Sequence, residues 1–375
     1  KNLEFYNSNQ KFPSNNIWVS ERQTMRGEEF LTITITPFNY YPSERRLEIF
    51  DEVDIEIVES GERENLSYKT MPRSKVFKKY MTKFSPNYVS RDNEKFQPPS
   101  ILYICGGNSA SDQAFQNLLD WRHERGYVVY TVNVDDIGNS SNNIQNYIED
   151  AYNNWEIPPE FVTIVGDASG SYSVDTNYEY FSGVNGEGDW PYSLLVGNDF
   201  FPEVIISRMS VRNPTHIGVV VNKILNYEKA TDMDDDWYET VSLVSDPYDS
   251  GISTVITNEY INSLFDIHGG ITDVRTQYSG SNFDSFMRDQ INDGVSYLNY
   301  RGFYGFSNFN SNDVNQLNNG YKLPFICTLT CGVNNFLTDN ESVVEALLRA
   351  GSAANPSGAV AVVGTSQSYT HTAFN

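Results

Sequence analysis

The chain has 375 residues, of which 39% are hydrophobic, 20% charged and 14% aromatic. At about 100–200 residues per domain, this length predicts two to three domains, and the hydrophobic fraction excludes a disordered chain. The 26 Lys and Arg against 49 Asp and Glu give a formal net charge of −23, which repels phosphate backbones and anionic lipid headgroups. We therefore expect no nucleic-acid partner. No apolar run approaches the roughly 18–20 residues that span a bilayer, so no membrane insertion is expected.

The cysteines and the first residues give little sign of metal or targeting chemistry. Cys105, Cys327 and Cys331 lack paired metal-ligand spacing and are too few for a disulfide framework in a chain of this length. The opening KNLEFYNSNQ has no basic region followed by an apolar one. We therefore expect either that a signal peptide has been removed or that the chain begins inside a longer precursor.

The first part of the chain predicts a small antiparallel β layer. Residues 30–36 alternate apolar and polar side chains, and the alternation resumes from Leu47 to Ile57 after a turn at Pro42. Residues 61–99 are then charged and aperiodic. The pattern predicts a β layer over residues 1–60 and a linker over 61–99.

After residue 99, short apolar strands alternate with helices of about a dozen residues, which is typical of a parallel sheet with helices on its faces. The pattern predicts strands at 101–105, 128–134, 161–165 and 203–207, with helices at 114–125, 144–155 and 217–229. It restarts after the acidic run 232–236, with strands at 241–245, 295–300, 325–330 and 359–363, and helices at 257–265, 283–289 and 343–349. We predict an α/β fold of two subdomains, residues 100–235 and 236–375.

Sites in open α/β sheets form beyond the carboxyl ends of the strands. Asp167, Asp246 and Cys331 all follow predicted strands, and Cys331 precedes Gly332, in a turn suited to directing backbone N–H groups at an oxyanion. The Cys331 thiol is either a nucleophile activated by a base or a small buried apolar residue. Cys105 and Cys327 lie in apolar strands, so we expect them to serve packing.

A base for this thiol would be a histidine, and the chain has 4 of them. His371 lies beyond the predicted strand 359–363, in the same subdomain as Cys331. It is either a base at the same sheet edge or a solvent-exposed loop residue. His123, His216 and His268 are predicted to be surface residues.

Several segments, in this order along the chain, together resemble the gingipain-like cysteine peptidases of family C25. Met25-Arg26-Gly27, followed by residues 32–41 and 46–57, resembles the family's propeptide. The resemblance to the catalytic region is carried by 163–167, 196–208, 323–331 and 356–362. The resemblance covers most of the chain.

This resemblance implies a caspase-like catalytic region of two side-by-side α/β subdomains, preceded by a propeptide-like β layer. It implies a hydrolase that cleaves protein or peptide substrates with a Cys–His pair assisted by an acid. Carried over by position, Cys331 is the nucleophile and Asp246 is the acid that orients the histidine. Backbone N–H groups near Gly302 and Cys331 would form the oxyanion hole.

The histidine itself is where the chain departs from the family. The family's Asn-Tyr-x-Gly-His-Gly motif corresponds to the run from Asn299 to Gly305, and Phe303 stands at the histidine position. Three explanations follow: His371 supplies the base, the protein is a degenerate peptidase that serves as a cell-surface binding or structural scaffold, or Cys331 works slowly without a histidine. Losing a general base typically costs about 10²–10⁴-fold in rate. Because Cys331 and Asp246 both remain, we favour an active endopeptidase.

The resemblance has further implications. It implies secretion, usually by the type IX route of bacteria, and hence an extracellular or cell-surface protein with secretion or surface partners and a sorting domain after Asn375. Thr254 stands nearest the family's primary-pocket acid, so specificity for basic residues is not predicted. No cofactor is required; the acidic segments 184–189 and 232–236 are either structural calcium sites or solvated surface. If the β layer is inhibitory, nicking between residues 61 and 99 should raise activity.

Overall fold

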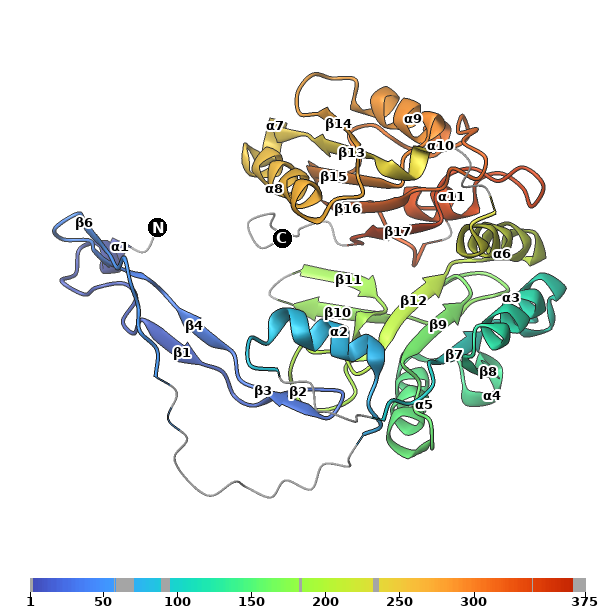
Figure 1. Cartoon of the computed structure of the whole chain (residues 1–375), viewed down its shortest axis with the longest axis horizontal. Coiled ribbons are helices and arrows are strands. Elements are labelled where there is room, and N and C mark those ends of the chain that lie inside the picture. The colour runs from blue at the N-terminus through green and yellow to red at the C-terminus, as the bar shows by residue number, and fades with distance from the viewer. Residues whose placement is uncertain are drawn as a thin grey trace. The chain divides into compact units, whose positions relative to one another are not determined.

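The structure is a computed structural model that describes residues 3–56, 58, 71–88, 95–181, 184–231, 236–338 and 340–366 (Figure 1). The internal contacts divide the chain into two compact units. The first comprises Lys1–Arg73, Phe77–Lys95 and Leu194–Glu203, and the second comprises Ser74–Val76, Phe96–Ser193 and Val204–Asn375. A short segment between two strands of the second unit's first sheet thus belongs to the first unit.

The first unit is built from short antiparallel ribbons. The strand pairs are β1 (Ile17–Val19) with β4 (Ile33–Ile35), β2 (Gln23–Met25) with β3 (Glu28–Phe30), and β5 (Phe38–Tyr41) with β6 (Arg46–Ile49). The unit also contains the short helix α1 (Leu3–Tyr6) and most of α2 (Lys75–Phe84). The antiparallel β region expected at the start of the chain is confirmed.

Two details expected in this unit are wrong. The alternation after Leu47 does not continue as a strand, because β6 ends at Ile49 and the described residues from Phe50 to Glu56 are not in a strand. Leu47 and Ile49 are 55% and 65% exposed. A two-stranded ribbon lacks the further strands or helix that would make one of its faces a core. Ile57 lies outside the described residues.

The second wrong detail is the aperiodic linker over residues 61–99, because α2 lies inside it. Phe77 and Met81 are buried, and their spacing of four residues places them on one face of the helix. Lysines occupy much of the rest of the helix, so its narrow apolar stripe was concealed in a charged stretch.

The first sheet of the second unit is parallel, with the strand order β12-β9-β7-β8. Its strands are β7 (Ser100–Cys105), β8 (Val128–Asn133), β9 (Phe161–Val165) and β12 (Ile205–Met209), and its helices are α3 (Gln113–Glu124), α4 (Val134–Ile137), α5 (Ser141–Asn154) and α6 (Pro214–Lys229). Asp112, Ser140 and Asn213 cap α3, α5 and α6 by accepting backbone N–H groups. A hairpin of β10 (Asn177–Phe181) and β11 (Val184–Gly188) precedes β12.

The second sheet is also parallel, with the order β14-β13-β15-β16-β17. Its strands are β13 (Thr240–Ser245), β14 (Asp273–Gln277), β15 (Tyr297–Tyr304), β16 (Phe325–Cys331) and β17 (Ala361–Gly364). Its helices are α7 (Pro247–Ser250), α8 (Ser253–His268), α9 (Phe283–Asp293), α10 (Ser311–Val314) and α11 (Val343–Arg349). The predicted α/β fold with consecutive strand–helix units is confirmed, and the edge strand β14 is an addition.

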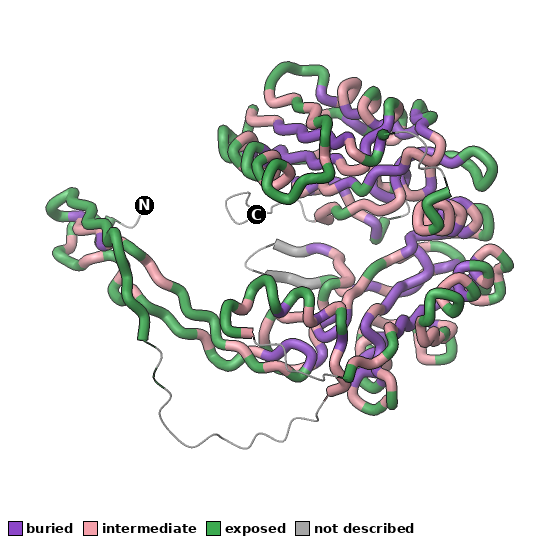
Figure 2. The backbone as a smooth tube through the Cα atoms, in the orientation of Figure 1, coloured by how far each residue is buried: buried purple, intermediate pink, exposed green. Residues whose placement is uncertain are grey.

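The core of the second sheet lies on one face of β15 and β16. Leu298, Tyr300 and Ile326 pack there with Phe283 and Met287 of α9. Burial of each such side chain contributes about 1.5–3 kcal/mol. Figure 2 shows these strands as buried and the ribbons of the first unit as largely exposed.

The other face of the second sheet carries a polar network under α8. Asn258 of α8 donates to the Val244 carbonyl over 2.9 Å and to Ser245 Oγ over 2.7 Å, and it accepts from Asn299 over 2.6 Å.

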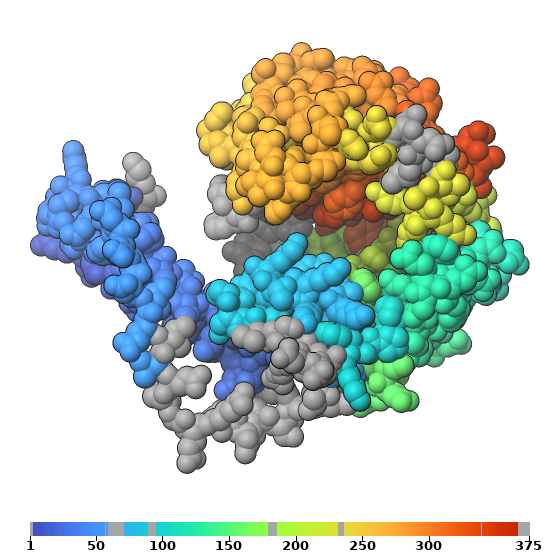
Figure 3. Space-filling model, viewed as in Figure 1, coloured from blue at the N-terminus to red at the C-terminus, as the bar shows by residue number. Residues whose placement is uncertain are grey.

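The surface formed by α8 and α9 is visible in orange tones in Figure 3. None of the helices in the described part of the chain combines the length and apolar character needed to cross a membrane.

Candidate functional site

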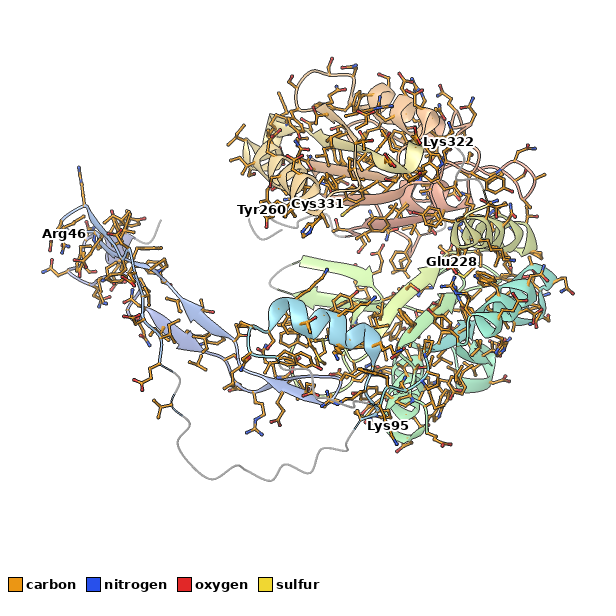
Figure 4. All side chains as sticks on the ribbon, in the orientation of Figure 1. Arg46, Lys95, Glu228, Tyr260, Lys322 and Cys331 are labelled. Atoms are coloured by element: carbon orange, nitrogen blue, oxygen red, sulfur yellow. The ribbon has the colours of Figure 1, made fainter. Side chains whose placement is uncertain are left out.

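Cys331 is the last residue of β16, where the carboxyl ends of the second sheet meet (Figure 4). It is 4% exposed, and its carbonyl accepts the Gly305 N–H over 2.8 Å. The following residue, Gly332, has φ +72, and a Cβ there would lie 3.0 Å from the Tyr304 ring. Only glycine satisfies both conditions without strain. The sequence therefore places a thiol directly before a tight turn that packs against an aromatic ring.

The neighbouring strand β15 ends in two exposed aromatic residues. Tyr304 pairs in register with Cys331 and is 59% exposed, while Phe303 is 52% exposed. The pairing shifts register between Arg301 and Tyr304, so a bulge separates these aromatics from the regular strand. Phe303, which the sequence motif places at the family's histidine position, offers no proton acceptor at this edge.

Asp246 follows β13 at the same edge and caps α7. Its Oδ1 accepts the Tyr248 N–H over 3.1 Å, and its Oδ2 accepts the hydroxyl of Ser307. The Tyr300 hydroxyl lies 2.5 Å from Ser307 Oγ, and burial raises the pKa of Tyr300. Because the Ser307 hydroxyl donates its hydrogen bond to the carboxylate, the Tyr300 hydroxyl must be the donor to Ser307 Oγ. Both Asp246 oxygens therefore hold hydrogen bonds that do not involve an imidazole.

Gly302, the predicted oxyanion-hole residue, lies in β15 just before Phe303. A Cβ at this position would be 2.3 Å from the Tyr300 hydroxyl, so the close approach of that hydroxyl requires glycine. The structure places Gly302 and Cys331 on adjacent strands near one edge. Their roles toward an oxyanion stay predictions.

The turn after Cys331 is tied to the segment that follows β17. The N–H groups of Val333 and Asn334 both donate to the Thr365 carbonyl, over 3.2 and 3.1 Å. The Thr365 hydroxyl in turn donates to the carbonyl of Thr330. Residue 365 is thereby anchored beside the candidate nucleophile. His371 lies outside the described residues, six positions beyond this anchor.

The loop after Cys331 is held by residues of the first sheet, of the loop after β12 and of the β10–β11 hairpin. The guanidinium of Arg208, on β12, lies 5.2 Å from the centre of the Phe336 ring. The Leu337 N–H donates to Glu187 Oε1 over 3.4 Å, and Arg212 donates to the Thr338 carbonyl over 3.3 Å. We call this group of contacts the loop clamp. Arg208 belongs to the family-like segment 196–208, which was the one sequence signal for it.

Asp167, another residue predicted to follow a strand, serves a different purpose. It is fully buried and paired with Arg212 and, over 2.6 Å, with Arg349 of α11. Burial opposes its ionisation, but hydrogen bonds from Arg212 and the charge of Arg349 hold its pKa below the ordinary value. Arg349 also pairs with Glu345 over 2.8 Å. This cluster joins the two sheets. Arg212 and Arg349 both bind the Asp167 carboxylate.

The remaining candidates lie away from this chemistry. Burial raises the pKa of Cys105 to about 12, as expected for a packing residue, and it also raises that of Cys327. His123 and His216 lie on α3 and α6, and His268 ends α8. The helix α8 starts near Asp246, at the carboxyl ends of the strands, and runs back along the sheet. Its last residue, His268, therefore lies toward the amino ends of the strands.

The described residues offer no group of side chains for a metal site, and Thr254 carries no carboxylate for a basic side chain. Thr254 is fully buried and its hydroxyl donates to the Gly251 carbonyl over 3.1 Å. Within the described part of the chain, no group of three or more His, Cys, Asp or Glu side chains could hold a metal ion. In the segment 184–189, Asp189 pairs with Arg208 over 2.7 Å. Most of the acidic run 232–236 lies outside the described residues.

Comparison with known proteins identifies the family. The sequence profile of peptidase family C25 matches residues 94–375, and that of the C25 propeptide matches residues 1–91. The chain belongs to peptidase family C25. The resemblance drawn from the sequence segments is therefore confirmed, and the N-terminal ribbons fall within the matched propeptide region.

Several C25 relatives come from Porphyromonas gingivalis. Gingipain R1 is 24% identical over 374 residues, which cover 96% of this chain and 37% of that protein. Gingipain R2 is 23% identical, covering 96% and 50%, and Lys-gingipain W83 is 25% identical, covering 74% and 16%. The chain thus spans at most about half the length of these curated relatives.

Two solved C25 structures share the fold. The Arg-specific cysteine proteinase gingipain R (RgpB) aligns with a TM-score of 0.63 and 25% identity, covering 74% of this chain and 64% of that one. A complex of the Porphyromonas gingivalis RgpB pro- and mature domains aligns with a TM-score of 0.64 and 25% identity, covering 73% and 65%. Both alignments agree with the α/β architecture of this chain.

Proposed function

We propose that the chain is a secreted cysteine endopeptidase that hydrolyses peptide bonds through Cys331. The observation that carries the proposal is the position of Cys331 at the end of β16, on a glycine turn and beside the end of β15. In α/β sheets this is where chemistry is placed. Membership of family C25 supports the same reaction class.

In this reaction the Cys331 thiol gives its proton to a base, and the sulfur attacks the scissile carbonyl carbon. The base then protonates the leaving amine as the C–N bond breaks, which leaves a thioester. Water hydrolyses the thioester, and its proton returns through the base to the sulfur. Backbone N–H groups near Gly302 and Cys331 stabilise the oxyanion.

His371 is the base of this proposal. The chain is anchored at Thr365, which binds the turn that follows Cys331. An extended chain covers about 3.3–3.6 Å per residue, so six residues beyond the anchor reach far enough to return to the thiol. His371→Ala should then abolish turnover and leave the fold, followed by circular dichroism, unchanged.

A thiol-reactive peptidyl probe tests the proposal directly. We expect labelling at neutral pH that is lost in Cys331→Ala and kept in the matched variant Cys327→Ala, which removes the other cysteine of β16. Labelling that survives in Cys331→Ala, or a Cys331 that does not react in the folded chain, would contradict the proposal.

A second candidate function is favoured by a specific observation. Phe303 stands at the position of the usual base, and Asp246 is occupied by Ser307 and the Tyr248 N–H. These features suit a protein that binds polypeptides at this edge without cutting them, as a cell-surface scaffold. Binding of a peptide together with an unreactive Cys331 would select this function over the peptidase.

Export and zymogen control belong to the same proposal. The acidic surface and the family suit an extracellular or cell-surface location reached by type IX secretion, with protein substrates and secretion partners. The first unit would act as an inhibitory propeptide. Limited proteolysis between residues 61 and 99 should then raise the hydrolysis rate, and unchanged hydrolysis after clean cleavage would instead give this unit a structural role.

A further inference from the structure

The edge that carries Cys331 is lined by exposed aromatic side chains. Phe303 and Tyr304 end β15, and Tyr248 on the adjacent α7 is 90% exposed. The Tyr304 ring lies against Gly332, the residue after the thiol. A side chain that a polypeptide places on the Tyr304 side of this turn would meet the ring.

The apolar surface extends from this edge along α8. Ile256 and Tyr260 are exposed and lie four residues apart on one face of the helix. The exposed Ile252, at the start of the helix, lies four residues before Ile256. Tyr260 is labelled in Figure 4. Exposed apolar side chains gathered in this way mark binding surfaces more often than scattered ones do.

A carboxylate at this edge, that of Asp246, is already engaged within the chain. Asp246 has one hydrogen bond on each oxygen, from the Tyr248 N–H and the Ser307 hydroxyl. Thr254 is a buried hydroxyl rather than an acid. The exposed acid nearest to Asp246 along the chain is Asp249 of α7. Asp249 is therefore the control residue in the first experiment.

We propose that this edge selects polypeptides by an aromatic or large aliphatic side chain beside Cys331, with Tyr304 as the specificity-determining residue and Phe303 extending the same surface. The inference deepens the proposed function and rests on it for turnover. Contacts between aromatic rings add to the favourable free energy of burying apolar area. A basic side chain would lose water beside these rings, where the Asp246 carboxylate already accepts the Tyr248 N–H and the Ser307 hydroxyl.

The first experiment measures kcat/KM for a series of N-acetyl tetrapeptide anilides that differ only in the residue before the scissile bond. Phe and Leu should exceed Arg and Lys by about tenfold or more. Tyr304→Ala should lower the Phe-to-Arg ratio by about tenfold, whereas Tyr304→Phe should keep it. Asp249→Asn should leave the ratio unchanged. A preference for Arg that disappears in Asp249→Asn would overturn the inference.

The second experiment separates the inference from the proposed function. Cys331→Ala is titrated with the matching acetylated peptide amides, and binding heat is measured. If the native chain hydrolyses nothing but Cys331→Ala binds the Phe peptide more tightly than the Arg peptide, the peptidase proposal fails and the selectivity stands. If the chain hydrolyses the Arg anilide best and binds the Arg peptide best, the peptidase stands and the selectivity is wrong.

Discussion

The guanidinium of Arg208 lies 5.2 Å from the centre of the Phe336 ring. Arg208 belongs to the first sheet and Phe336 to the loop after Cys331, so a buried cation of one subdomain supports the candidate nucleophile of the other. Arg208 is itself fixed by two 2.7 Å hydrogen bonds to Asp189 and by the Val174 carbonyl at 2.9 Å. This bidentate pairing gives the loop clamp a rigid base.

Arg208→Lys should loosen the loop after Cys331. Lysine keeps the charge but cannot make the bidentate pair with Asp189, and it lacks the planar guanidinium that contacts the Phe336 ring. We expect a loss of about 1–3 kcal/mol in the free energy of unfolding and faster alkylation of Cys331 in the folded chain. Urea denaturation and iodoacetamide labelling measure the two effects.

Arg122→Lys is the matched control for this substitution. Arg122 makes a bidentate pair with Glu228, over 2.5 and 2.7 Å, between α3 and α6 of the first subdomain. Arg122→Lys should lower the free energy of unfolding by a similar amount and leave the alkylation rate of Cys331 unchanged. Equal acceleration in both variants would show that the clamp acts only through global stability.

The sequence predicted the parts of the site that lie at the ends of apolar strands. Cys331 and Asp246 lie at the ends of such strands. The alternation of strands with helices predicted a parallel sheet, which places both residues at its carboxyl edge. The strand β14 was missed because its residues, DVRTQ, are mostly polar at a sheet edge. Edge strands carry a weaker apolar signal than central ones.

The contacts around these residues left no comparable trace in the sequence. Ser307, which binds Asp246, is 61 residues away from it, and its φ of 43 is a backbone feature that no periodicity announces. The Arg208–Phe336 contact spans two subdomains. Such pairs follow from how the chain packs, and a local pattern of residue types does not encode them.

Glu203 makes the stability of the first unit depend on pH. It is fully buried, and it accepts the N–H groups of Leu195 and Val196 over 2.8 and 3.2 Å. Burial raises its pKa from 4.5 to about 7, against the effect of those hydrogen bonds. The folded state therefore holds a proton between pH 4.5 and 7 that the unfolded state has released. Stability should fall as pH rises through this window and stay level above it.

Glu203→Gln should remove this pH dependence. The amide oxygen still accepts the Leu195 and Val196 N–H groups but carries no charge. The gain at pH 8 should be about 2–4 kcal/mol. Hydrogen exchange of the peptide covering residues 194–203, corrected for intrinsic rates, measures it. The exposed acid variant Glu21→Gln is the control. An unaltered pH profile in Glu203→Gln would contradict the assignment.

Arg349→Met should break the buried cluster that joins the two sheets. Arg349 donates to Asp167 over 2.6 Å, to Ser210 Oγ over 2.7 Å and to Glu345 over 2.8 Å. Removing one partner of a buried ion pair typically costs about 3–5 kcal/mol. Urea denaturation should show this loss. Adding Glu345→Gln, which neutralises the carboxylate left behind, should recover part of it, and a loss below about 1 kcal/mol would count against the cluster as a structural joint.

Phe303→His tests whether this sheet edge lacks only its base. Phe303 is exposed, so an imidazole fits there without disturbing the core. A general base contributes about 10²–10⁴-fold to rate, so in a His371→Ala background Phe303→His should raise hydrolysis of a peptide anilide by that order. Activity should increase with pH through about 6.5, as the imidazole loses its proton. Phe303→Ser controls for loss of the aromatic ring, and adding Cys331→Ala should remove the gain. A further gain in Phe303→His with Ser307→Ala would indicate that Asp246, freed from the serine hydroxyl, orients the new imidazole. With His371 intact, Phe303→His should leave hydrolysis unchanged, because the site then already has its base.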